Sequence, residues 1–86
     1  MYRVELSKRA FKSLERLDSE VRCRVLEKLA ALREEPIPRG AIKLRGEKDA
    51  YRLRIGDYRI LYKVLWEERV VLVFKVEHRR RAYRRS

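Results

Sequence analysis

Residues 51–64 read YRLRIGDYRILYKV, a stretch in which apolar and polar side chains alternate on both sides of Gly56-Asp57. Alternation with a period of two is typical of a half-buried strand, and a two-residue link with glycine first is typical of a tight antiparallel turn. Counting outward from this turn places Arg54 directly opposite Arg59. The sequence therefore predicts a β-hairpin with one apolar face and one cationic face.

One strand and two helices are predicted before the hairpin. Residues 2–6 alternate as a strand, and Ser7 is suited to be the N-cap of a helix. The apolar residues then recur at helical spacing in two runs, Phe11, Leu14 and Leu17, followed by Val21, Val25, Leu29 and Leu32. Asp18 and Ser19 favour a break between the two helices, and a Pro-x-Pro segment that starts at Pro36 ends the second one.

A further strand is predicted over residues 70–76, the most hydrophobic run in the chain. Its composition indicates a central strand, and we expect Leu72, Phe74 and Val76 to face the helices. Residues 1–86 are therefore predicted to form a single α+β domain of order β-α-α-β-β-β. The helical hairpin should pack on one face of a small, mostly antiparallel four-stranded sheet.

The composition indicates a polyanionic partner. Lys and Arg number 24 against 13 Asp and Glu, which gives a formal net charge of +11. Such an excess repels itself unless an anion is near, and the predominance of arginine favours bidentate recognition of phosphate. The other explanation, a thermophilic charged surface, would predict a mixture of signs.

Cysteine content and hydropathy favour the cytoplasm. Cys23 is the only cysteine, so the chain cannot form an internal disulfide, which is typical of an intracellular protein. No apolar run approaches the roughly 18–20 residues that a membrane span needs, and residues 1–6 lack the apolar core of a signal peptide. We therefore expect a cytoplasmic protein with no membrane partner.

The cationic face of the hairpin extends beyond Arg54 and Arg59. By strand parity, it should also hold four further cations: Arg52, Lys63, Lys75 and Arg79. Like charges directly opposite one another destabilise a hairpin by a few tenths of a kcal/mol to about 1 kcal/mol, and a bound phosphate would compensate. We expect this face to bind RNA.

Residues 78–86 add a second cationic group with two functional side chains, His78 and Tyr83. The arginines that accompany them are Arg79, Arg80, Arg81, Arg84 and Arg85. Arginines interleaved with an aromatic ring suit an exposed RNA nucleotide, because the guanidinium groups bind phosphates and the ring stacks on the base. Histidine titrates near neutral pH, so His78 is also a candidate for proton transfer.

Three stretches together resemble the RelE branch of the RelE/ParE superfamily of toxin–antitoxin toxins: Lys43-Leu44-Arg45-Gly46, residues 51–62, and Val76-Glu77-His78-Arg79 with Tyr83. The resemblance covers nearly the whole chain. Toxins of this branch enter the A site of the ribosome and cut mRNA there, and a cognate antitoxin neutralises them. The resemblance therefore implies a translation inhibitor whose partners are mRNA, the ribosomal A site and a RelB-like antitoxin.

The same resemblance assigns roles to single residues. It implies a catalytic basic pair at Arg52 and Arg54, a phosphate-binding arginine at Arg59, a second arginine at Arg79 and the C-terminal tyrosine at Tyr83. Well-studied bacterial members carry lysine at the first two positions. Eight further cations are expected to contact RNA or the ribosome: Lys43, Arg45, Lys63, Lys75, Arg80, Arg81, Arg84 and Arg85.

Arginine is a poor general base because its pKa lies above about 12. We therefore assign base and acid to His78 and Tyr83, with Glu77 or Glu47 as further base candidates. The expected reaction is attack of a ribose 2′-hydroxyl on its own 3′-phosphate. No metal or other cofactor is expected, since the sequence has one His, one Cys and no carboxylates at ligand spacing.

Two alternatives stay open at this point. A ParE-like gyrase inhibitor shares the fold and lacks the RNA-cutting residues. A non-catalytic module would bind RNA or the ribosome on the basic face without cutting.

Overall fold

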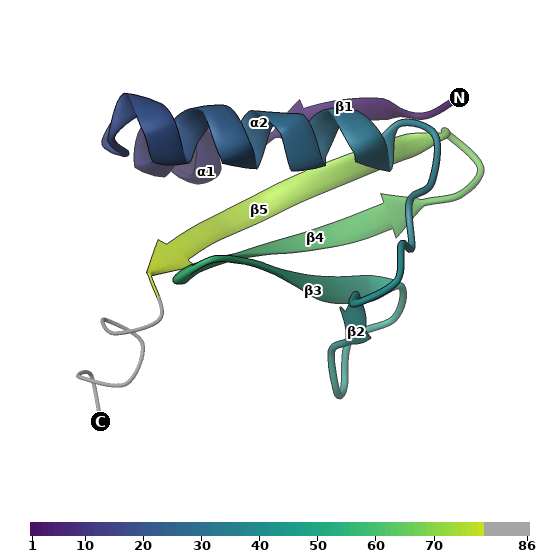
Figure 1. Ribbon diagram of the computed structural model, residues 1–86. Helices are drawn as coiled ribbons and strands as arrows, with labels where there is room; N and C mark the ends of the chain where they lie inside the picture. The colour runs from purple at the N-terminus through teal and green to yellow at the C-terminus, as the bar shows by residue number, and fades with distance from the viewer. Residues whose placement is uncertain (79–86) are drawn as a thin grey trace.

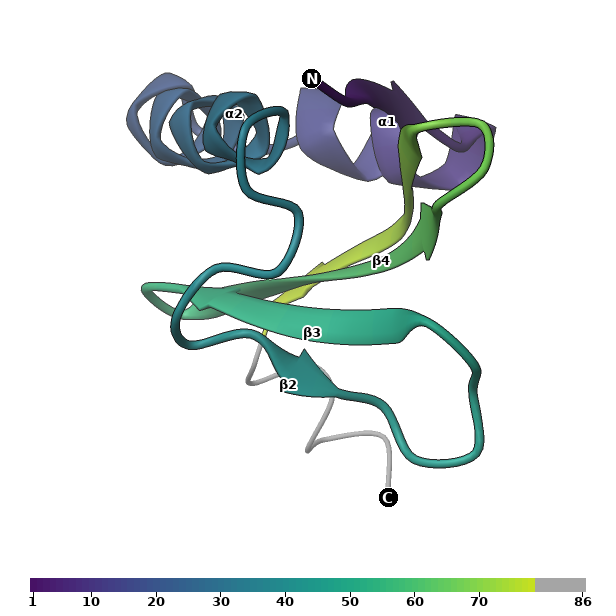
Figure 2. The ribbon, with the colours of Figure 1, turned by 90° about the vertical axis from the view of Figure 1, so that its right-hand side faces the viewer.

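The computed structural model describes residues 1–78. Its elements are β1 (Arg3–Leu6), α1 (Lys8–Glu15), α2 (Ser19–Leu32), β2 (Ile42–Lys43), β3 (Ala50–Ile55), β4 (Tyr58–Leu65) and β5 (Val70–His78). The two helices lie side by side on one face of the sheet, and the other face is left uncovered by them (Figures 1 and 2). This arrangement confirms the predicted α+β class.

Within residues 1–78 the sheet has five strands in the order β1-β5-β4-β3-β2, so the prediction of four strands was wrong. The additional strand, β2, pairs antiparallel with β3 and contains only Ile42 and Lys43. Two residues are too few to show an alternating pattern, which is why the sequence did not reveal this strand. β1 runs parallel to β5, and the other neighbouring pairs are antiparallel.

The register of the central hairpin is the predicted one. Arg54 lies opposite Arg59, and the turn between the strands is formed by Gly56 and Asp57. Gly56 has a φ of 60°, which side chains rarely tolerate, and a Cβ there would also lie 3.3 Å from Nη2 of Arg24 on α2. A glycine at this position therefore permits both the tight turn and the close approach of Arg24 from α2.

The start of α1 also follows the prediction. The Ser7 hydroxyl accepts a hydrogen bond from the backbone N–H of Ala10 at 3.1 Å, as an N-cap does. The backbone N–H of Ser7 donates to the carbonyl of Val73 at 2.9 Å. Arg22 of α2 donates to the carbonyls of Glu15 and Leu17 and thereby ties the end of α1 to the start of α2.

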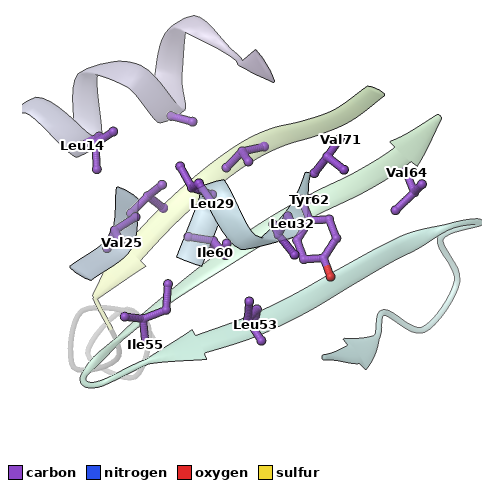
Figure 3. Packing of buried hydrophobic residues seen from close by; sticks show 13 residues of the cluster. Leu14, Val25, Leu29, Leu32, Leu53, Ile55, Ile60, Tyr62, Val64 and Val71 are labelled. Carbon is purple, nitrogen blue, oxygen red and sulfur yellow. The ribbon is translucent and has the colours of Figure 1, made fainter. Parts of the chain in front are cut away.

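The hydrophobic core fills the layer between the helices and the sheet (Figure 3). α2 contributes Val25, Leu29 and Leu32, as its spacing predicted. On α1 the buried residues are Ala10 and Leu14. Phe11 was expected on this apolar stripe, but it is 49% exposed, because the stripe that faces the sheet includes position 10 instead. Neither helix within residues 1–78 has the length and apolar composition that crossing a membrane requires.

The longest strand, β5, contains a bulge. Leu61 of β4 pairs with Lys75, whereas the next residue, Tyr62, pairs with Val73. Phe74 is therefore an extra residue without a partner position on β4. A bulge of this kind reverses which residues of a strand point to a given face.

This reversal explains why the expected core residues of β5 were only partly right. Val76, beyond the bulge, is buried as predicted. Before the bulge, Val71 and Val73 are fully buried, whereas Leu72 and Phe74 are half-buried. The sequence shows no pattern that reveals a bulge in an uninterrupted apolar run.

Tyr62 anchors the connection between α2 and the sheet. Its side chain is fully buried, its hydroxyl donates to the carbonyl of Pro36 at 2.8 Å, and its ring stacks on Tyr51 with centroids 5.8 Å apart. Burial, with a smaller effect from the Tyr51 hydroxyl, raises the pKa of Tyr62 to about 12. The bond to Pro36 fixes the start of the segment that leads to β2.

Candidate nucleic-acid interface

Three arginines converge on one pocket on the face of the sheet that the helices leave uncovered. Arg52 and Arg54 are two residues apart on β3, and Arg59 lies opposite Arg54 on β4. The pocket measures about 330 Å³, and its walls are completed by Gly40 and Ile42. We call these five residues the arginine pocket. The predicted trio of Arg52, Arg54 and Arg59 is thus brought together at one place.

A carboxylate from β5 holds one of these arginines. Glu77 lies opposite Arg59 in the sheet, and Nε of Arg59 donates to Oε2 of Glu77 at 2.5 Å. Nζ of Lys75 lies 3.3 Å from the other oxygen, Oε1. An arginine also carries donors on Nη1 and Nη2, so the same guanidinium can donate to a phosphate while Nε stays on Glu77. Glu77 therefore orients Arg59.

The protonation of Glu77 suits this orienting role. Burial raises the pKa of its carboxyl group, but the hydrogen bonds and positive charges of Arg59 and Lys75 outweigh burial and hold the pKa below its ordinary value. The group is therefore ionised at neutral pH. A carboxylate that two cations stabilise is a weak base, which argues against the role of general base.

His78 lies at the end of β5 and on the other face of the sheet. It pairs with Tyr58, and the two rings meet edge to face with centroids 4.7 Å apart. Since Tyr58 has the parity of Ile55, which is buried, the register places His78 away from the face of Arg59 and Glu77. The structure does not bring His78 into the arginine pocket.

The further cations divide between the two faces. Lys63 and Lys75 have the parity of Arg59 and Glu77 and extend the same face. Lys43 pairs with Tyr51 and so lies on the opposite face from Arg52, while Arg45 is exposed in the loop after β2. Six predicted residues lie outside the described part of the chain: Arg79, Arg80, Arg81, Tyr83, Arg84 and Arg85.

Two features of the site were missed at the level of sequence. The partnership of Arg59 with Glu77 could have been found, because Glu77 has the parity of Lys75, which the sequence places on the same face as Arg59. Ile42 and Gly40 gave no such signal, since neither belongs to an alternating or helical pattern.

Three guanidinium groups around one cavity can bind a phosphate through several charge-assisted hydrogen bonds. They can also stabilise the extra negative charge of a pentacoordinate phosphorus, for which a single preorganised donor can be worth roughly 3–4 kcal/mol. Within residues 1–78, no group of three or more His, Cys, Asp or Glu side chains is arranged to hold a metal ion.

Comparison with known proteins identifies the family. The family model described as the ParE toxin of the type II toxin–antitoxin system parDE matches residues 4–83. The mRNA interferase toxin RelE of Escherichia coli K12 is 39% identical over 83 residues, which cover 94% of this chain and 86% of that protein. The chain belongs to the RelE/ParE superfamily of type II toxins. The resemblance found in the sequence is thereby confirmed.

Solved RelE structures share the fold over nearly their whole length. In the archaeal RelE–RelB complex from Pyrococcus horikoshii OT3, the matching chain is 40% identical with a TM-score of 0.82, covering 91% of this chain and 94% of that one. The isolated E. coli RelE toxin is 31% identical with a TM-score of 0.82, covering 99% and 98%. The helical pair and the five-stranded sheet are therefore shared with these RelE structures.

Proposed function

We propose that this chain is the toxin of a type II toxin–antitoxin system and that it inhibits translation by cleaving mRNA in the A site of the ribosome. The observation that carries the proposal is the convergence of Arg52, Arg54 and Arg59 on one pocket. The identity to a relative named mRNA interferase supports the same function. A surface of this charge suits the crowded phosphates of a ribosome-bound message.

The proposed reaction is an intramolecular phosphoryl transfer. The ribose O2′ forms a bond to the adjacent phosphorus, the bond from phosphorus to O5′ breaks, and a 2′,3′-cyclic phosphate and a 5′-hydroxyl result. One proton leaves O2′ and one reaches O5′. Arg52, Arg54 and Arg59 would stabilise the phosphorane with their fixed positive charges, which is the contribution that makes a metal-independent reaction feasible.

The two proton transfers need a base at O2′ and an acid at O5′. His78 and Tyr83 stay our predictions for base and acid. His78 lies on the other face of the sheet from Arg59 and does not line the arginine pocket, so its role depends on the substitution described below. Tyr83 lies beyond the described residues. Glu77 takes the positioning role instead, because its carboxylate is already bound by two cations. The substitution His78→Ala should lower cleavage at least about tenfold if His78 transfers a proton. An unchanged rate would remove it from the mechanism.

The proposed partner is a RelB-like antitoxin. The relatives of known structure include RelE–RelB complexes from P. horikoshii and E. coli. A net charge of +11 favours binding of an acidic or strongly anionic partner. Co-expression with the cognate antitoxin should relieve growth inhibition, and purification should yield a complex of the two chains.

Primer extension on mRNA from a purified translation system tests the activity. Adding the chain should produce breaks within codons that occupy the A site, and the substitution Arg52→Ala should remove most of them. Arg9→Ala is the matched control, because Arg9 is an exposed arginine on α1 and does not line the pocket. Intact messages with translation unaffected would contradict the proposal.

Metal independence has its own test. A single phosphorothioate at the scissile position slows a reaction that needs a metal on that oxygen, and a thiophilic ion such as Cd²⁺ then restores the rate. We expect no restoration. Rescue by Cd²⁺ would mean that a metal ion takes part.

The description of the matching family model also favours one other activity. ParE-like toxins inhibit gyrase, and the model that matches residues 4–83 is described as ParE. A supercoiling assay with purified gyrase, run beside the translation assay, separates the two. Inhibition of gyrase with no mRNA breaks would replace our proposal.

A further inference from the structure

The arginine pocket contains one apolar wall, which its cationic function does not explain. Ile42 is 52% exposed and lies opposite Arg52 in the sheet, so its side chain points to the same face as that guanidinium. It is not part of the hydrophobic core formed by the described residues. Its neighbour Ala41, in contrast, packs against that core.

A lone exposed isoleucine is common on protein surfaces and needs no explanation by itself. Ile42 differs because it lines the same cavity as Arg52, Arg54 and Arg59. A phosphate alone would use the guanidinium groups and leave the isoleucine in water. A ligand that joins an anion to a flat apolar group would use both.

The size of the cavity limits that ligand. At about 330 Å³, the pocket lies at the lower end of the range of roughly 300–1,000 Å³ that is typical of small-ligand sites. This is room for one nucleotide and too little for a folded peptide element. Gly40, with no side chain and a φ of 97°, leaves the adjoining wall open.

We propose that the arginine pocket holds a single nucleotide of the RNA, with its 3′-phosphate on the three arginines and the face of its base on Ile42. This inference rests on the proposed function and adds the part of the message that the pocket receives. An isoleucine offers no hydrogen bonds to the edges of a base, so the contact discriminates by apolar area. Every base can bind, and purines bind more tightly than pyrimidines because their ring system is larger.

Binding of mononucleotides to the purified chain tests the inference without a ribosome. Adenosine 3′-monophosphate should bind at least about fivefold more tightly than inorganic phosphate, because the base adds contact area at Ile42. Cytidine 3′-monophosphate should fall between the two. Isothermal titration gives the affinities, and the methyl resonances of Ile42 should shift with the nucleotides and much less with phosphate.

The decisive variant is Ile42→Ser. It should lower the affinity for adenosine 3′-monophosphate to about that of phosphate and leave phosphate binding unchanged, whereas Ile42→Leu should preserve nucleotide binding. Ile37→Ser is the matched control, since Ile37 is also an exposed isoleucine between α2 and β3, at 38%, and lies outside the pocket. Thermal unfolding of all three variants should stay close to that of the parent, because neither position belongs to the core.

The outcomes separate this inference from the proposed function. If the parent chain cleaves mRNA and Ile42→Ser binds the nucleotide equally well, the inference is wrong and the proposed function stands. If the parent chain does not cleave mRNA but Ile42→Ser loses nucleotide binding, the nucleotide site stands and the proposed function is wrong. Equal affinity of the parent for phosphate and for adenosine 3′-monophosphate would reduce the pocket to a phosphate site and overturn the inference.

Discussion

The two faces of the β3–β4 hairpin are made of alternate residues of the same strands, yet they differ in nearly every property. The face toward the helices holds buried Leu53, Ile55, Ile60, Tyr62 and Val64. The uncovered face holds Arg52, Arg54, Arg59 and Lys63. Residues of one parity thus stabilise the fold, and residues of the other parity form the proposed phosphate site. Substitutions on the two faces should therefore have separate consequences.

The largest expected effect is on the buried face. Ile60→Ala removes a fully buried side chain and should lower the free energy of unfolding by roughly 2–5 kcal/mol. Its neighbour Leu61 is half-buried on the opposite face, so Leu61→Ala should have a clearly smaller effect. Urea denaturation of the two variants gives the comparison. Equal losses would mean that the two faces contribute alike to stability.

The next effect is on the uncovered face. Arg59→Ala should lower ribosome-dependent cleavage by about 10²–10³-fold, because it removes a fixed donor from the proposed phosphate site. The unfolding free energy should change by only about 1 kcal/mol, since the Arg59–Glu77 pair is partly exposed. Single-turnover cleavage and urea denaturation measure the two quantities. A variant that is unfolded at assay temperature would contradict the separation of the faces.

A smaller effect with a defined pH dependence is expected at Tyr62. Tyr62→Phe loses the hydrogen bond to Pro36 and should lower the unfolding free energy by about 1 kcal/mol at neutral pH. In the parent, the folded state keeps the phenol neutral up to a pKa of about 12, whereas the unfolded chain ionises it near 10.0. The stabilisation is therefore fully present below pH 10 and declines as the pH rises toward 12.

The Phe variant has no such ionisation at position 62. The difference between parent and variant should therefore shrink, and then reverse, as the pH rises through this window. Denaturation of both proteins at pH 7, 10 and 11 measures it. A difference that stays constant over this range would contradict the assigned pKa.

The smallest effect should have the opposite sign. Arg54 is exposed and faces Arg59, so Arg54→Gln relieves a repulsion between like charges and should raise the unfolding free energy by roughly 0.2–1 kcal/mol at low salt. The gain should disappear in 1 M NaCl, where the charges are screened. Phosphate binding should weaken in the same variant. A variant that is more stable and binds phosphate more weakly would show that the like charges on this face serve ligand binding at the expense of stability.

Patterns within short stretches of sequence correctly predicted the register of the hairpin and the start of α1. The register from Arg54 to Arg59 follows from a two-residue turn, and the N-cap at Ser7 from one hydroxyl before an apolar stripe. Counting residues outward from the turn also placed the three arginines of the pocket on one face. A period of two fixes the face of every residue once the turn is known.

Tertiary context decided the rest. The bulge at Phe74 reversed the parity of β5, and nothing in an uninterrupted apolar run signals such an insertion. β2 exists because residues 42 and 43 meet β3, and this pairing places Ile42 in the pocket and Lys43 on the other face. The bulge and β2 both depend on which strand pairs with the segment. A short stretch of sequence does not contain that information.

The parallel pairing of β1 with β5 has a consequence for biosynthesis. Arg3 to Leu6 pair with residues 70–73, and the hydroxyl of Ser7 donates to the carbonyl of Phe74 across 67 positions of sequence. Contacts between such distant segments form late, because closing a long loop is entropically unfavourable until most of the domain can assemble around it. A nascent chain that ends before residue 70 has neither this pairing nor the Glu77 that orients Arg59. We expect such truncated products to be unfolded and harmless, so that toxicity begins only when synthesis has passed β5.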